Sequence, residues 1–232
     1  MNRLFVKICG LTRSQDVDLA AGLGASALGF VFWPNSPRNV SAQAVRAMTA
    51  NLPASIMKVG VFVDQPIADV AGTMDEAGLD VAQLHGHESP DYCRRLQVRL
   101  SAAARPIPVS FGETRRSPRE GGKPDTTIFK AIGMTDNGST NIDDFDADVV
   151  LLVDAHDPVQ FGGTGKTVNW DSAREIAARR RTILAGGLNA ANIQLAVRSV
   201  RPYGVDVSSG VESAPGVKDP NRLRTFFEAL HD

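Results

Sequence analysis

The sequence predicts an α/β protein, built as a single (β/α)8 barrel from residues 1–232, with a long irregular insertion between the fourth and fifth strands. Short runs rich in Val, Ile, Leu and Phe recur along the chain, and segments with helical spacing of apolar residues separate them. This alternation implies parallel strands joined by right-handed crossovers. Eight such units in 232 residues fit a closed TIM barrel, with a doubly wound open sheet as the alternative.

The expected strands consist almost entirely of apolar residues, which is typical of strands covered on both faces. They are Leu4–Cys9, Ser26–Phe32, Met57–Val63, Leu79–Leu84, Thr127–Ile132, Asp148–Val153, Arg181–Ala185 and Gly204–Ser208. A dinucleotide-binding open sheet would carry the pattern G-x-G-x-x-G after its first strand, and Cys9-Gly10-Leu11-Thr12-Arg13 lacks it. The closed barrel is therefore favoured.

Helices are expected between and after these strands. Several of them begin with Ser, Asp or Asn, whose side chains cap free N–H groups at a helix start. They are Ser14–Leu23, Ser41–Ala50, Pro66–Ala77, Ser89–Leu100, Asp171–Arg180, Asn189–Val200 and Asp219–Leu230, with a further short acidic helix at Asn141–Ala147.

One connection is longer than the others. The segment Ser101–Asp125 is rich in Pro and Gly, which predicts an irregular loop. Surface loops accept extra length at little thermodynamic cost, so a tolerated insertion is the first interpretation. A basic docking loop built on Arg115, Arg116 and Arg119 is the alternative.

Composition limits the classes of function. The chain has 25 basic and 26 acidic side chains and a net charge of −1, which gives no reason to expect nucleic acid or an acidic membrane as partner. No signal peptide and no stretch of about 18 apolar residues is visible. Two cysteines favour a reducing compartment, so a cytoplasmic protein is expected. Cys9, Cys93 and the four histidines lack metal-ligand spacing, so no metal site is expected.

In barrels of this class the active site lies at the carboxyl ends of the strands. Cys9 ends the first strand and Asp154 follows the sixth, so they would face one another across the ring. A thiol and a carboxyl group placed in this way can act as an acid–base pair. The alternative interpretation is structural: Cys9 would be a buried core thiol and Asp154 a turn cap.

Two glycine-containing loops follow the last two strands and predict a phosphate site. Glycine allows backbone N–H groups to approach an anion, and a following helix N-terminus adds positive potential. The residues are Gly186, Gly187, Ser208, Ser209 and Gly210. Alternatively, the glycines simply turn the chain.

A third glycine-rich loop, Gly162-Gly163-Thr164-Gly165-Lys166, lacks the spacing of a Walker A motif and does not directly follow a strand. It is interpreted as a flexible loop over the site, with Gly162, Gly163, Thr164 and Gly165 at its centre.

An ordered set of motifs runs through nearly the whole chain. It comprises Lys7-Ile8-Cys9-Gly10, Gly29-Phe30-Val31-Phe32 with Ser36-Pro37-Arg38, Gly60-Val61-Phe62-Val63, Gln83-Leu84-His85-Gly86, Leu152-Val153-Asp154, Gly162–Lys166, Gly186-Gly187-Leu188 and Val205–Glu212. Each motif alone is weak. In this order they closely resemble the phosphoribosylanthranilate isomerases of tryptophan biosynthesis. The length of Ser101–Asp125 is the departure from that family.

The resemblance implies an Amadori rearrangement of N-(5-phosphoribosyl)anthranilate to 1-(2-carboxyphenylamino)-1-deoxyribulose 5-phosphate. It implies Cys9 as the base and Asp154 as the acid, Arg38 at the anthranilate carboxylate, and His85 and Asp206 as residues lining the pocket. It implies no cofactor and no metal, because the substrate nitrogen supplies the electron sink. A small-molecule phosphosugar substrate is the expected partner, and a monomer is the expected state, with a dimer as the alternative.

Two rival functions are weighed against this one. The related aminoaldose isomerase of histidine biosynthesis would place an aspartate at the end of the first strand and repeat a half-barrel, whereas this chain has Cys9 there. A non-catalytic phosphate-binding regulatory barrel has no need for Cys9 and Asp154 at opposing strand ends. The fold alone cannot decide, since this barrel supports many functions.

Overall fold

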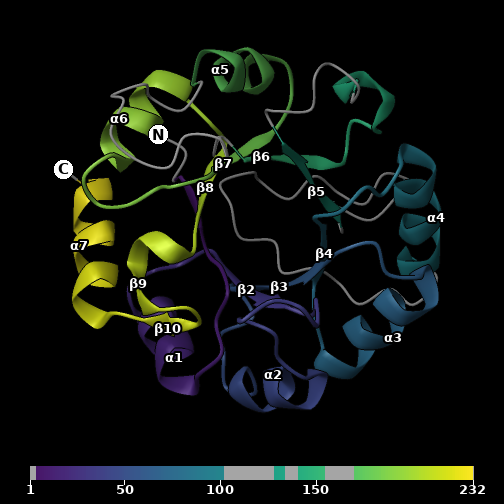
Figure 1. Cartoon of the computed structure of the whole chain (residues 1–232), viewed down its shortest axis with the longest axis horizontal. Coiled ribbons are helices and arrows are strands. Elements are labelled where there is room, and N and C mark those ends of the chain that lie inside the picture. Colours follow the sequence, from purple (N-terminus) through teal and green to yellow (C-terminus); the bar gives the residue numbers. More distant parts are fainter. Residues whose placement is uncertain (1–3, 102–127, 134–140, 155–169, 232) are drawn as a thin grey trace.

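A computed structural model describes residues 4–101, 128–133, 141–154 and 170–231. Eight parallel strands form a closed barrel in chain order, and β1 pairs with β8 to close it (Figure 1). The strands are β1 Phe5–Ile8, β2 Ala27–Val31, β3 Met57–Phe62, β4 Val81–Leu84, β5 Ile128–Gly133, β6 Val150–Asp154, β7 Thr182–Ala185 and β8 Gly204–Val207. This confirms the predicted barrel and rules out the open sheet.

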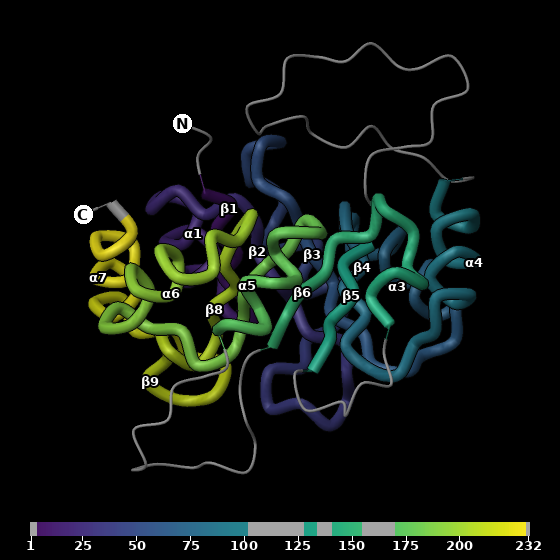
Figure 2. The backbone as a smooth tube through the Cα atoms, turned by 90° about the horizontal axis from the view of Figure 1, so that it is seen from above, coloured from purple at the N-terminus to yellow at the C-terminus, as the bar shows by residue number. Residues whose placement is uncertain are grey.

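Helices surround the barrel and cover its outer face (Figure 1). They are α1 Ser14–Gly22, α2 Ala42–Met48, α3 Ile67–Ala77, α4 Pro90–Ser101, α5 Trp170–Arg179, α6 Ile193–Val200 and α7 Pro220–His231. The last helix packs beside the first, as the view in Figure 2 also shows. Among the described helices, none combines the length and the apolar character needed to cross a bilayer.

Helix α6 begins later than the sequence predicts, at Ile193 instead of Asn189. Side-chain oxygens cause the delay. Asn192 Oδ1 accepts a hydrogen bond from the Asn189 backbone N–H at 2.9 Å, and Asn189 Oδ1 accepts one from the Ala191 N–H at 2.9 Å. Such local bonds compete with helix formation, so residues 189–192 form a turn.

The short acidic helix expected at Asn141–Ala147 is a wrong prediction in its length. The structure has a single 3-10 turn there, η1, at Ile142–Asp144. Asn141 Oδ1 accepts a hydrogen bond from the Asp143 N–H at 3.2 Å, which caps this turn. Asp143 and Asp144 are exposed, while Phe145 is buried and has an extended backbone conformation that ends the turn.

Sequence reasoning also missed two short strands after β8. They are β9 Glu212–Ala214 and β10 Val217–Lys218, which pair antiparallel. Most of the expected insertion Ser101–Asp125, including Arg115, Arg116 and Arg119, lies outside the described residues.

The barrel interior is apolar at the amino ends of the strands. Phe5 packs there against Phe129, with ring centroids 6.1 Å apart, and stacks on Tyr203 at 5.6 Å. Side chains alternate along a strand, so Lys7 and Cys9 follow Phe5 on the inward face of β1. The apolar layer therefore closes one end of the barrel, and polar side chains gather at the other.

Candidate active site

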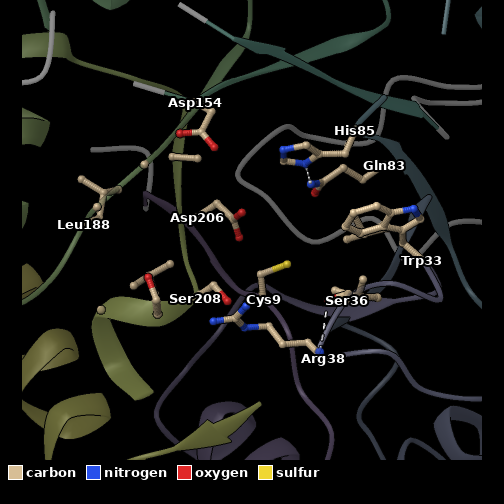
Figure 3. A pocket seen from close by; sticks show the side chains of 18 of the residues that line it. Cys9, Trp33, Ser36, Arg38, Gln83, His85, Asp154, Leu188, Asp206 and Ser208 are labelled. Carbon is tan, nitrogen blue, oxygen red and sulfur yellow. Dashed lines mark hydrogen bonds between the residues drawn. The ribbon is translucent and has the colours of Figure 1, made fainter. Parts of the chain in front are cut away.

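The carboxyl ends of the strands surround a cavity of about 520 Å³ (Figure 3). Its lining includes every site residue that the sequence predicts within the described part of the chain. These residues are Cys9, Arg38, His85, Asp154, Gly186, Gly187, Asp206, Ser208, Ser209 and Gly210. The expected loop residues Gly162, Gly163, Thr164 and Gly165 lie outside the described residues.

Cys9 lies at the floor of the cavity. It is 7% exposed, and its backbone N–H donates to the Val207 carbonyl at 2.9 Å, which ties it to the end of β8. Gly29 on β2 leaves room for the thiol, because a Cβ at Gly29 would lie 2.8 Å from Cys9 Sγ. Burial raises the pKa of the Cys9 thiol, and the nearby ammonium of Lys7 opposes that shift.

Asp154 is the last residue of β6 and is half-buried. In Figure 3 its carboxylate and the sulfur of Cys9 point into the cavity from different sides, with Asp206 between them. A substrate lying across the cavity would therefore have a thiol on one side and a carboxyl group on the other.

His85 contributes an imidazole to the wall nearest Asp154 (Figure 3). The ring reaches solvent in the cavity, yet protein surrounds it on most sides, and this partial desolvation lowers its pKa. Gln83 Nε2 lies 3.0 Å from His85 Nδ1. If the amide donates to Nδ1 of a neutral ring, the proton of that ring would be on Nε2.

Arg38 enters the cavity from the loop between β2 and α2 and is fixed by a two-pronged ion pair. Its Nε donates to Glu212 Oε1 at 2.9 Å and its Nη2 to Glu212 Oε2 at 2.6 Å. Lys218 Nζ donates to the same carboxylate at 2.7 Å and also to the backbone carbonyls of Cys9 and Ser208. Burial opposes ionisation of Glu212, but the hydrogen bonds from both cations outweigh it and lower the pKa of that carboxyl group.

The loops after β7 and β8 meet at one side of the cavity. Gly186 and Gly187 have φ values of +91° and +64°, which favour glycine. Gly210, in the 3-10 turn η2 at Ser209–Val211, comes so close to the other loop that a Cβ there would lie 1.8 Å from the Leu188 carbonyl oxygen. The two glycine-containing loops are therefore packed directly against one another.

The sequence-based predictions gave no role to two residues of this site, Trp33 and Glu212. Trp33 is 38% exposed on the cavity wall, where its ring offers an apolar surface (Figure 3). Glu212 follows the last barrel strand within a motif of the sequence, but its pairing with Arg38 spans 174 positions. No local pattern in the sequence predicts that pairing.

Within the part of the chain that the structure describes, no group of three His, Cys, Asp or Glu side chains is arranged to hold a metal ion.

Comparisons with known proteins identify the family of the chain. The chain matches the family described as N-(5'-phosphoribosyl)anthranilate (PRA) isomerase over residues 6–111 and 119–229. The unmatched residues 112–118 lie within the expected insertion. A relative of that name from Pelobacter propionicus is 42% identical over 222 residues, which is 96% of this chain and 93% of the relative. Another, from Chromohalobacter salexigens, is 42% identical over 232 residues, 99% of this chain and 95% of the relative.

Solved structures give the same result. The phosphoribosyl anthranilate isomerase of Thermus thermophilus superposes with a TM-score of 0.75 at 37% identity, covering 98% of both chains. A second such isomerase, solved in complex with reduced 1-(o-carboxyphenylamino)-1-deoxyribulose 5-phosphate, superposes with a TM-score of 0.74 at 29% identity over 99% of both chains. With a match along nearly its full length, the chain belongs to the N-(5'-phosphoribosyl)anthranilate isomerase family.

Proposed function

We propose that this protein converts N-(5-phosphoribosyl)anthranilate into 1-(2-carboxyphenylamino)-1-deoxyribulose 5-phosphate, a step of tryptophan biosynthesis. The proposal depends mainly on one observation, which is that four kinds of chemical group line the same cavity. A thiol at Cys9, a carboxyl group at Asp154, a cation at Arg38 and two glycine-containing loops line the same space. Membership of the family supports the same reaction.

The reaction needs one proton donor and one proton acceptor. Asp154 protonates the furanose ring oxygen, and the ring opens to a Schiff base between C1 and the anthranilate nitrogen. Cys9, as the thiolate, then removes the proton from C2 to give an enolamine. In the tautomerisation to the ketone, C1 gains the proton that Cys9 removed from C2, and the C2 hydroxyl loses a proton that restores the Asp154 acid, so both groups return to their starting states. The atoms of substrate and product are the same, so no redox partner is consumed.

The two ends of the substrate are bound by different chemistry. The Arg38 guanidinium keeps Nη1 for the anthranilate carboxylate, because Nε and Nη2 are used by Glu212. Trp33 provides an apolar wall for the aromatic ring. At the other end, backbone N–H groups of Gly187 and Ser209 bind the phosphate. His85 and Asp206 line the cavity between these ends.

Substituting lysine for Arg38 is expected to raise KM about 10–100-fold, with a smaller fall in kcat. Lysine keeps the positive charge but loses the planar fork that contacts Glu212 on one edge and the substrate on the other. Steady-state kinetics with varied substrate concentration measure this. Arg46 on α2, whose guanidinium bonds to backbone carbonyls of α3, gives a matched control as Arg46→Lys. An unchanged KM in Arg38→Lys would place the carboxylate elsewhere.

The phosphate site is tested at Gly210. Gly210→Ala places a Cβ against the Leu188 carbonyl and forces the two loops apart. We expect at least about 10-fold weaker binding of substrate and of inorganic phosphate, because charge-assisted bonds to the anion are lost. Phosphate competition against substrate measures both. Gly72→Ala on α3, where a Cβ would meet no atom within 4 Å, is the control. Normal phosphate competition in Gly210→Ala would show that the anion binds elsewhere.

The function itself is tested by adding the purified protein to phosphoribosylanthranilate and following the fluorescence of the substrate. Conversion to the ketose removes that fluorescence, so a decay that depends on protein concentration is the expected result. A stable signal would contradict the proposal. Turnover of the histidine-pathway aminoaldose in its place would favour that rival activity.

Two further expectations complete the proposal. Cys9 must remain a free thiol to act, which supports a reducing, cytoplasmic location. A monomer is the state that we expect, with a dimer as the alternative. Light scattering at assay concentration measures the oligomeric state, and a dimer would contradict that second expectation.

A further inference from the structure

A buried ion pair lies inside the barrel beneath the cavity. Lys7 on β1 is 0% exposed, and its Nζ donates to Asp206 Oδ1 on β8 at 2.8 Å. The two residues are direct partners in the β1–β8 register. Asp206 lines the cavity floor, whereas Lys7 lies below it. Phe5, two positions before Lys7 on the same strand, belongs to the buried apolar cluster at the amino end of the barrel.

Such a pair costs folding free energy in a barrel interior, because both ions lose their hydration. Apolar residues of similar volume are often at least as stabilising, so stability alone does not explain the pair. A second buried pair in the same barrel has a structural reason. Lys130 Nζ bonds to Glu88 at 3.0 Å and also to the Gly86 carbonyl at 2.7 Å, which fixes the end of β4. Within the described residues, Lys7 makes no such bond to a backbone carbonyl.

The position of Lys7 relative to Cys9 suggests another reason. The two residues are two positions apart on one strand, so their side chains share the inward face. Gly29 on β2 shows that they also converge. A Cβ at Gly29 would lie 2.8 Å from Cys9 Sγ and 3.0 Å from Lys7 Nζ, so both atoms border the small space that this glycine leaves open.

We propose that Lys7 is a positioning residue of the active site: its buried ammonium, held in place by Asp206, stabilises the negative charge that Cys9 carries when it acts as base. This inference rests on the proposed function, which assigns the base to Cys9. A buried thiolate is unfavourable because it loses its hydration, and the electrostatic attraction of an ammonium next to the sulfur offsets that desolvation free energy.

The charges around the thiol decide the sign of the effect. Burial raises the pKa of the Cys9 thiol, Lys7 lowers it, and Asp206 raises it again. For Lys7, burial acts to lower the ammonium pKa, but Asp206 and Cys9 outweigh burial and raise it, so the ammonium stays charged. The other charged groups that face the thiol are Lys218 and Arg38, both paired with Glu212.

The test is the pH dependence of Cys9 alkylation by iodoacetamide, with the modified peptide quantified by mass spectrometry so that Cys93 is counted separately. Without Lys7, in Lys7→Met, the Cys9 thiol pKa should be about 1–3 pH units higher than in the parent protein. In Asp206→Asn it should be lower, because the opposing negative charge is gone. A purely structural pair would give no such opposite shifts.

Loss of one partner can also impair folding, so the double variant Lys7→Met/Asp206→Asn, which leaves no unpaired charge, is compared with Asp206→Asn. We expect the higher thiol pKa in the double variant, since only the ammonium differs. Lys130→Met, which removes the other buried ammonium, should leave the Cys9 thiol pKa unchanged. Equal thiol pKa values in the double variant and Asp206→Asn would overturn the proposal, and so would an equal rise in Lys130→Met.

Turnover supplies a second readout. A base must be deprotonated to act, so the rise of kcat/KM with pH, which reports on the free enzyme, should move upward in Lys7→Met together with the thiol pKa, and activity should recover at alkaline pH. Alkylation is measured without substrate. The two proposals can therefore fail separately. Full activity of Cys9→Ser would refute Cys9 as the base in the proposed function. Alkylation profiles that do not shift in Lys7→Met would refute the role of Lys7 alone.

Discussion

Replacing Cys9 with serine should lower kcat by about 10²–10⁴-fold while binding of a product analogue is preserved. A serine hydroxyl has nearly the same shape as the thiol but is a far weaker acid, so it does not supply an anionic base near neutral pH. The buried position next to Gly29 accommodates the smaller oxygen without strain. Steady-state kinetics, with calorimetric binding of reduced product, separate the two effects.

Cys93→Ser is the matched control for this variant. Cys93 is also buried, at 2% exposure, but it lies on α4 outside the cavity lining. Burial raises the pKa of both thiols, but Cys93 does not line the cavity, so it is out of reach of a substrate there. We expect Cys93→Ser to retain kcat. Near-normal turnover in Cys9→Ser would remove Cys9 from the mechanism.

The second large effect is expected at Asp154. Asp154→Asn keeps the size and hydrogen-bonding capacity of the side chain, but an amide cannot give up a proton at neutral pH. Ring opening should therefore stall, with a loss of about 10²–10⁴-fold in kcat and substrate that accumulates in its closed furanose form. Stopped-flow kinetics at saturating substrate measure the loss.

Asp75→Asn, at an exposed position on α3, controls for removal of a carboxylate as such and should have normal kcat. Full activity of Asp154→Asn would mean that another group protonates the ring oxygen. His85 would then be examined first, because its imidazole shares the cavity wall with Asp154.

The strands were predictable because their composition reflects burial on both faces. Each observed strand ends within two residues of its predicted bounds, as with β2 at Ala27–Val31 for the predicted Ser26–Phe32. Helix ends were less predictable where side chains compete with the backbone, as Asn189 and Asn192 do before α6. The local sequence could not show whether those asparagines cap a helix or form a turn.

Candidate site residues were predictable where a strand end carries a polar or glycine residue, as at Cys9 and Asp154. The charged residues that support Cys9 could not be predicted in the same way. Lys7 sits in an apolar run, and lysine usually reaches solvent. Its partner Asp206 is 199 positions away and becomes a neighbour only when β1 and β8 close the barrel. The sequence predicts the closed barrel but not the register that places Lys7 opposite Asp206, so this supporting contact could be found only in the structure.

The most direct test of the account is a crystal structure of this protein with reduced 1-(o-carboxyphenylamino)-1-deoxyribulose 5-phosphate. We expect C2 of the ribulose chain about 3.5 Å from Cys9 Sγ, with Asp154 on the other side of that chain. It also predicts the phosphate on the backbone N–H groups of Gly187 and Ser209, and the carboxylate on Arg38. A ligand whose C2 lies against another basic group, with Cys9 out of reach, would contradict the account.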